Sequence, residues 1–213
     1  MKIDTIRLRL ALGFLAIALP IIVSILALIY GYIPGHIIPD SISATYYYDP
    51  CITPFMIILG AASIVLICYK GYDKLDDIIC TISGLLGLCI CLFPCYNGTF
   101  INVGTFHISV DISSVIHNIT AMIFFALLSF NSFFLFTKGD ANPTENKKKR
   151  NIIFRVCGIG MVASFLLLIP GHIFNIYGMT WIVETIALAF FGISWLTKAD
   201  IFPFLFCDSP YKD

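Results

Sequence analysis

Charged side chains are scarce in this chain. Lys, Arg, Asp and Glu together make up 12% of its 213 residues, about half the share of an ordinary soluble domain, whereas hydrophobic residues make up 59%. The 13 basic residues balance the 13 acidic ones and form no patch that could follow a nucleic-acid backbone. The composition therefore excludes a soluble globule and a nucleic-acid partner, and it predicts an integral membrane protein in contact with membrane lipids.

The familiar signatures of catalytic and metal sites are also missing. The chain contains no HExxH, no His-x-x-x-His and no paired CxxC, so any metal site would have to be assembled from separate helices. Ser43 lacks the glycine-flanked elbow that exposes the nucleophile in many hydrolases. Zinc therefore remains possible as a cofactor, with its ligands unknown.

Long apolar runs are abundant, and each is close to the roughly 20 residues that cross a bilayer as a helix. This pattern predicts an all-α polytopic bundle of six transmembrane helices that forms one domain over residues 1–213. The runs cover residues 8–32, 52–69, 78–94, 113–136, 152–177 and 179–197.

Proline and glycine mark a break near the end of the fifth run. Pro170 removes a backbone donor and is followed by Gly171, so we expect the helix to end or kink there. Gly178 then stands between the fifth and sixth runs, where it can form a tight reversal.

The basic residues lie on alternate connections. All 13 are near the start of the first run, in connection 70–77, in or beside connection 137–151, or after the last run. Connections 33–51, 95–112 and 178 have none. Because Lys and Arg are retained on the cytoplasmic side during insertion, this pattern predicts that both termini are cytoplasmic.

The first connection without basic residues is rich in polar and aromatic side chains. Tyrosine rings lie favourably at the headgroup level, so its three tyrosines are typical of a membrane interface. Several polar residues stand beside these tyrosines in the sequence, which also allows a second interpretation, namely that this connection forms a lid over a site. The residues concerned are His36, Asp40, Ser41, Ser43, Tyr46, Tyr47, Tyr48 and Asp49.

All four histidines are predicted on the outer side. His36 and His172 occupy equivalent places in a repeated segment, since Ile33-Pro34-Gly35-His36-Ile37 recurs as Ile169-Pro170-Gly171-His172-Ile173. The repeat is explained either by two similar helix ends or by two histidines of one site.

Glu184 is the acidic residue that most needs an explanation. It lies about one turn inside the sixth run, where an ionised carboxylate costs a few kcal/mol unless it faces water or a partner. His117 has a similar depth on the fourth run. Either the two line a cavity open to the outer face, or one hydrogen bond between them joins two helices. Around His117, polar residues recur at helical spacing: Asp111, Ser113, Ser114 and Thr120.

Two functions from different classes fit these residues. The first is a hydrolase that acts on a lipid or small amphiphile, and the second is a non-catalytic ligand-binding, sensing or transport protein. The sequence indicates no oligomeric state. The candidate catalytic residues are His117, Glu184 and Ser43, and the candidate substrate-binding residues are His36, Tyr46, Tyr47, Asp111 and His172.

Two cysteines are placed where a disulfide would be possible. Cys51 and Cys95 lie at the outer ends of the second and third runs, which are predicted to form an antiparallel hairpin. An oxidising envelope could join them, or both could stay reduced.

Short motifs resemble known membrane proteins. Ser41-Ile42-Ser43 with the following tyrosines, and Ile116-His117 with Phe124-Phe125, resemble a group of uncharacterised bacterial six-helix membrane proteins. The resemblance implies a multi-pass protein of the bacterial inner membrane. A more distant similarity is to the alkaline ceramidase and adiponectin-receptor superfamily, whose zinc sites use a serine, an aspartate and three histidines. Here no helix carries paired histidines and there are six runs rather than seven, so that similarity assigns no ligand.

Overall fold

Six long helices form the protein, as a computed structural model shows for residues 2–96, 98, 101–139 and 143–201. Within this part of the chain, each is long and apolar enough to cross a membrane. This confirms the predicted all-α six-helix bundle, and the chain is a multi-pass membrane protein. The helices are α1 (Lys2–Ile29), α2 (Asp49–Cys68), α3 (Lys74–Leu92), α4 (Val110–Phe130), α5 (Glu145–Leu166) and α7 (Met179–Lys198).

Short elements join the long helices. The 3-10 helix η1 (Ser43–Tyr47) precedes α2, the π-helix η2 (Asn131–Leu135) extends α4, and the one-and-a-half-turn helix α6 (Leu168–Ile173) follows α5. A two-stranded hairpin, which the sequence analysis did not predict, pairs β1 (Asn102–Val103) with β2 (Ile108–Ser109) in antiparallel register.

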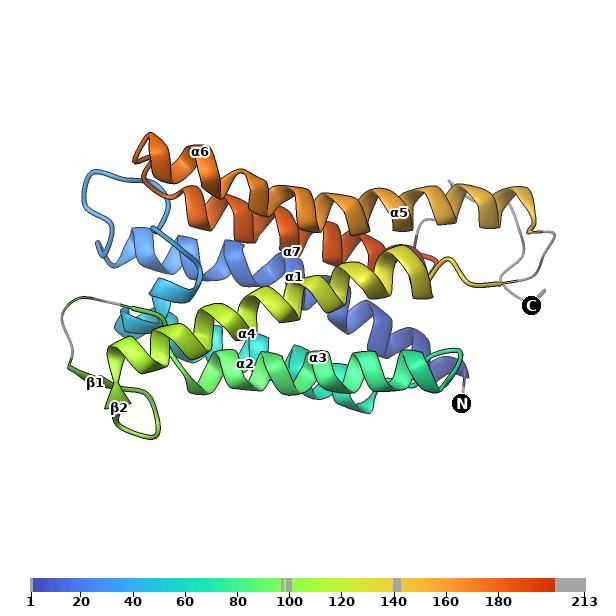
Figure 1. The fold of residues 1–213 in the computed structure, drawn as a ribbon, viewed down its shortest axis with the longest axis horizontal. Helices are drawn as coiled ribbons and strands as arrows, with labels where there is room; N and C mark the ends of the chain where they lie inside the picture. Colours follow the sequence, from blue (N-terminus) through green and yellow to red (C-terminus); the bar gives the residue numbers. More distant parts are fainter. Residues whose placement is uncertain (1, 97, 99–100, 140–142, 202–213) are drawn as a thin grey trace.

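The two ends of the bundle differ in composition. Figure 1 shows the hairpin, α6 and the connection between α1 and α2 at one end, which we name the loop end. The start of α1, the connection between α2 and α3, the start of α5 and the end of α7 lie at the opposite, basic end. The Lys and Arg residues of the described helices belong to the basic end. The helices therefore separate a basic end from a loop end without basic residues.

Helix α5 begins earlier than the sequence analysis predicted. Its first residue is Glu145, seven positions before the predicted run, because the hydroxyl of Thr144 caps the helix by accepting a hydrogen bond from the Lys147 N–H at 3.2 Å. The basic block 147–150 therefore lies on the first turns of a helix and not in a connection. Capping is a local effect that the apolar pattern does not reveal.

The predicted break in the fifth run is confirmed, three residues before the proline. Helix α5 ends at Leu166 and α6 begins at Leu168. Pro170 has no N–H to donate to the carbonyl of Leu166 four positions earlier, which explains why the regular helix stops there. Gly178 adopts a left-handed conformation with φ of 71°, as its place before α7 requires.

Close packing of α2 and α3 depends on glycine. A Cβ added to Gly84 would lie 2.4 Å from the carbonyl oxygen of Ser63, and one added to Gly87 would lie 2.2 Å from the Ser63 hydroxyl oxygen. Small residues let membrane helices approach closely enough for backbone contact. This contact fixes the position of α3 against α2, and the residues at the end of α3 and just after it form part of the site described below.

Candidate functional site

Three carbonyl groups that follow α3 organise the loop end. The final carbonyls of a helix have no partner within it, and Pro94 prevents the helix from continuing. Each of these carbonyls instead accepts a hydrogen bond from a side chain of another segment. The bonds run from His117 Nδ1 to Phe93 at 2.7 Å, from Ser113 Oγ to Pro94 at 2.8 Å, and from the Tyr47 hydroxyl to Cys95 at 2.5 Å.

The bond to Phe93 determines which nitrogen of His117 carries hydrogen. A carbonyl oxygen only accepts, so Nδ1 must be the donor. His117 is 4% exposed and has its other nitrogen, Nε2, 3.0 Å from the Ser43 hydroxyl oxygen. In the neutral imidazole Nε2 is an acceptor, and Ser43 then donates to it. A hydroxyl and an imidazole at this distance form the pair found in activated serine nucleophiles.

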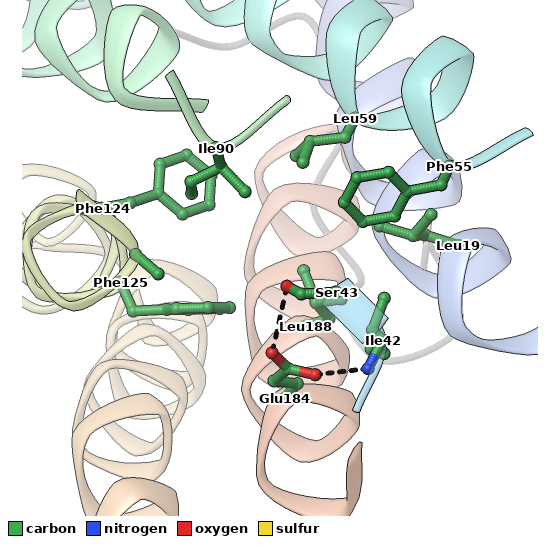
Figure 2. Close-up of a pocket in the computed structure, with 11 residues that line it drawn as sticks. Leu19, Ile42, Ser43, Phe55, Leu59, Ile90, Phe124, Phe125, Glu184 and Leu188 are labelled. Carbon is green, nitrogen blue, oxygen red and sulfur yellow. Dashed lines mark hydrogen bonds between the residues drawn. The ribbon is translucent and has the colours of Figure 1, made fainter. Parts of the chain in front are cut away.

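Glu184 holds the backbone and side chain of the same loop segment. Its Oε2 accepts a hydrogen bond from the Ile42 N–H at 2.6 Å, and its Oε1 lies 3.4 Å from the Ser43 hydroxyl oxygen. Figure 2 shows both bonds meeting at the carboxyl group, which α7 presents to the loop. His117 and Glu184 are therefore not bonded to each other directly, which was one of the two interpretations of the sequence; Ser43 lies between them.

The three side chains share their protons. Ser43 has one hydroxyl hydrogen, which it can give to His117 or to Glu184 but not to both. If it donates to His117, a protonated Glu184 can donate to Ser43; if it donates to Glu184, a protonated His117 donates to Ser43. Both arrangements hold the same number of protons. The three hydrogen-bonded side chains can thus move a proton between an acid on α7 and an imidazole on α4 without changing their total charge.

A narrow cavity, which we name the apolar pocket, lies beside these hydrogen-bonded side chains. Its volume is about 40 Å³, enough for about three water molecules or the end of an alkyl group. Ser43 and Glu184 are the polar side chains in its lining, and Figure 2 shows apolar residues around them. The walls come from five long helices, with Leu19 of α1, Phe55 of α2, Ile90 of α3, Phe124 of α4 and Leu188 of α7.

The structure brings the three candidate catalytic residues together but disperses the candidate binding residues. His36 is exposed and stacks on Tyr177, with 3.6 Å between ring centroids. Asp111 is exposed on the first turn of α4 and does not line the apolar pocket. His172 belongs to α6, and its side chain lies outside the described part of the structure.

The two candidate tyrosines have different roles. Tyr46 packs against the core and meets the Tyr47 ring edge-on at 5.3 Å. Tyr47 donates to the carbonyl of Cys95, and burial, followed by the nearby Cys95 and Tyr46, raises the pKa of its phenol well above the ordinary value. It therefore stays a neutral donor. Tyr47 therefore attaches η1 to the segment that follows α3.

Of the two alternatives for Cys51 and Cys95, the structure shows the reduced one, without a disulfide. Both thiols are free, and Cys51 donates a weak hydrogen bond to the Val23 carbonyl, with 3.5 Å between sulfur and oxygen. Burial, followed by the Glu184 carboxyl group, raises the pKa of Cys95 to about 12. Among the described residues, no group of three or more His, Cys, Asp and Glu side chains is placed to hold a metal ion.

Sequence reasoning missed the main-chain half of the site. The carbonyl of Phe93 and the N–H of Ile42 hold His117 and Glu184, yet every residue except proline has both groups. The one available signal was Pro94, which predicts unpaired carbonyls at the end of the third helix.

The fold and the site together define a polytopic membrane helix bundle with a hydrogen-bonded Ser–His–Glu chain beside an apolar pocket. No protein-family model matches the chain, and no curated protein and no solved structure matches it either. The function therefore has to be argued from the chemistry of the site.

Proposed function

We propose that this protein is a membrane hydrolase that cleaves an acyl bond of an amphiphile, with Ser43 as nucleophile and His117 as general base. The observation that carries the proposal is the 3.0 Å contact between Ser43 Oγ and His117 Nε2, made by an imidazole whose Nδ1 is held at 2.7 Å by the Phe93 carbonyl. A base oriented by a third group is the arrangement that activates a serine.

The reaction follows from these contacts. Ser43 Oγ attacks the substrate carbonyl carbon while its proton passes to His117 Nε2, and the Phe93 carbonyl supports the imidazolium through Nδ1–H. His117 then gives the proton to the leaving group, which departs and leaves an acyl ester on Ser43. A water molecule attacks this ester with His117 again as base, releasing the carboxylic acid and restoring the hydroxyl.

Glu184 acts as a positioning residue in this scheme. Its bond to the Ile42 N–H at 2.6 Å holds the residue that precedes the nucleophile. The apolar pocket beside Ser43 suits the part of an acyl chain next to the scissile carbonyl.

A fluorophosphonate probe, which reacts covalently with activated serines, tests the proposal. We expect the purified protein in detergent to be labelled at Ser43 and Ser43→Ala to remain unlabelled. His117→Ala should react about 10²- to 10⁴-fold more slowly, the usual contribution of a general base. Ser41→Ala is the matched control, because the Ser41 hydroxyl accepts from the Ala44 N–H and does not contact His117. Its labelling rate should equal that of the wild type.

The alternative is a non-catalytic ligand-binding, sensing or transport protein. One observation favours it: Ser43, His117 and Glu184 already satisfy one another, as in a fixed latch between the loop and two helices. Folded protein that the probe leaves unlabelled, or labelling that survives His117→Ala, would contradict the hydrolase and support this alternative.

We also propose that the basic end faces the cytoplasm and the loop end the outer side of a bacterial inner membrane. The support is the distribution of the 13 basic residues and the resemblance to bacterial six-helix proteins. A reporter that is active only in the cytoplasm, fused after residue 213, should be active. Activity of an export-dependent reporter at the same position would contradict this orientation and place the site inside the cell.

A further inference from the structure

A second, larger cavity, which we name the polar pocket, lies at the loop end. Its volume is about 310 Å³, and it is formed between the connection that follows α1 and the segment that joins α6 to α7. Its polar lining residues are Asp40, Asn175, Tyr177 and Thr180.

The two pockets adjoin along two short stretches of chain. Asp40 lines the polar pocket, while Ile42 and Ser43 line the apolar pocket. On α7, Thr180 lines the polar pocket and Glu184, one turn further on the same face, lines the apolar pocket. One extended molecule could therefore place a polar group beside Asp40 and an apolar chain beyond Ser43.

The charged residue in the lining of the polar pocket is an acid, Asp40. Asp40 is exposed, and among the described residues its carboxylate has no hydrogen-bond or ion-pair partner. The pKa of the Tyr177 phenol is raised, first by burial and then by the Asp40 carboxylate. Residues 10–69, 75–137 and 156–197 contain no Lys or Arg, so no permanently charged cation of the loop-end connections offsets this charge.

The start of α7 does not replace the missing cation. Helix N-termini bind phosphate through free N–H groups. Here the Met179 N–H is bonded to the Ile176 carbonyl at 3.3 Å, and the Trp181 N–H is bonded to the Asp40 carbonyl at 3.0 Å. Two of the first N–H donors of α7 are therefore already bonded to carbonyl groups of the protein and cannot bind a phosphate. A phosphate in this pocket would meet Asp40 without a Lys or Arg side chain to compensate its charge.

We infer that the polar pocket binds the headgroup of the amphiphile, and that this headgroup is neutral or cationic and carries no phosphate. Hydroxyl groups can donate to Asp40 and Asn175. An ammonium group can pair with Asp40 and lie against Tyr177, whose ring is stacked on His36. The inference rests on the proposed function for the cleavage step, but the selection of the headgroup is a matter of binding.

Three octanoyl esters with the same chain test this selection. The probes are octanoylcholine, which is cationic, 1-octanoylglycerol, which is neutral, and 1-octanoylglycerol 3-phosphate, which is anionic. For the wild type, kcat/KM for the first two should exceed that for the phosphate by about tenfold or more, the size expected for one unscreened like charge at contact range. If octanoylcholine has the highest kcat/KM, the pocket selects an ammonium group. If 1-octanoylglycerol has the highest kcat/KM, the pocket selects hydroxyl groups. The phosphate ester as an equal or better substrate would overturn the inference.

Asp40→Asn identifies the source of the selection. It should remove most of the preference for choline over phosphate, because the charge that attracts the ammonium group and repels the phosphate group is lost. Asp111→Asn is the matched control, since Asp111 is an exposed acid of the same end that lines neither pocket. An unchanged choline-to-phosphate ratio in Asp40→Asn would contradict a role for this carboxylate.

Binding measurements separate this inference from the proposed function. In Ser43→Ala, the same three esters can be titrated by Trp fluorescence, because Trp181 follows Thr180 of the pocket and bonds to Asp40. If no ester is hydrolysed and Ser43 resists the fluorophosphonate, the hydrolase is wrong. The headgroup inference then stands if choline and glycerol esters bind more tightly than the phosphate ester, and fails if all three bind equally.

Discussion

The close contact between α2 and α3 makes a prediction that reaches the site. Gly84→Ala would place a Cβ 2.4 Å from the Ser63 carbonyl oxygen and 3.0 Å from the Ile67 nitrogen. Both atoms are backbone, so no side chain can rotate away. Ordinary contact begins at 3.4 Å, and α3 must therefore move from α2 by about 1 Å. Overpacking of this kind costs about 1–3 kcal/mol of unfolding free energy.

Gly60→Ala is the matched control for this substitution. Gly60 lies inside α2, and a Cβ there would meet nothing within 4 Å. Both substitutions replace a helical glycine by a better helix former, a gain of up to about 1 kcal/mol. The difference in unfolding free energy between the two variants therefore isolates the clash, and it should be about 1–3 kcal/mol.

The same shift should disturb the nucleophile. Helix α3 is followed by the Phe93 carbonyl, which orients His117. A displacement of about 1 Å can cost up to about 10²-fold in rate, so Gly84→Ala should slow labelling of Ser43 by the fluorophosphonate while Gly60→Ala leaves it unchanged. Unfolding is followed by Trp fluorescence during titration with SDS, where Trp195 is 1% exposed and reports on the core. Equal stability and equal labelling in the two variants would refute the reasoning.

Two further predictions concern the loop end and the basic end. Tyr47→Phe removes the 2.5 Å hydrogen bond to the Cys95 carbonyl and should lower the unfolding free energy by about 1 kcal/mol. Tyr46→Phe is the control, because the Tyr46 hydroxyl has no hydrogen bond among the described residues. Its unfolding free energy in the same SDS titration should be close to that of the wild type. At the basic end, Lys138 bonds to Asp73 at 2.7 Å, which lowers the pKa of Asp73 and raises the pKa of Lys138. This pair contributes stability above the ordinary carboxyl value of 3.8 and below the ordinary lysine value of 10.5, and loses it as the pH falls or rises beyond them. Urea or SDS titrations across pH should thus show Lys138→Met and wild type converging at both extremes; a constant difference would contradict the assignment.

The number of helices and the break near Pro170 could be predicted because their causes are local. A bilayer requires about 20 apolar residues for each crossing, and any chain segment that meets this condition reveals itself by composition. Proline likewise acts on the carbonyl four residues before it, wherever the helix lies. The start of α5 was missed because a capping hydroxyl at Thr144, and not the end of an apolar run, determines it.

The site was predictable only in part. A carboxyl group at the depth of Glu184 and an imidazole at the depth of His117 need partners in a bilayer, so they could be selected from the sequence as a pair. Asp111 follows the same helical spacing as His117 yet is exposed, because spacing places a residue on a helix face and does not say what covers that face.

By itself the sequence determined that this chain crosses a membrane six times, and that its basic residues gather at one end. Only the tertiary structure decided that Ser43 lies between His117 and Glu184, and that an exposed Asp40 begins the same segment. These side chains come from three separate parts of the chain, and the carbonyl of Phe93 and the N–H of Ile42 hold His117 and Glu184 in place. Backbone groups are the same in every residue except proline, so which of them meets which side chain depends on how the helices pack and not on any pattern in the sequence.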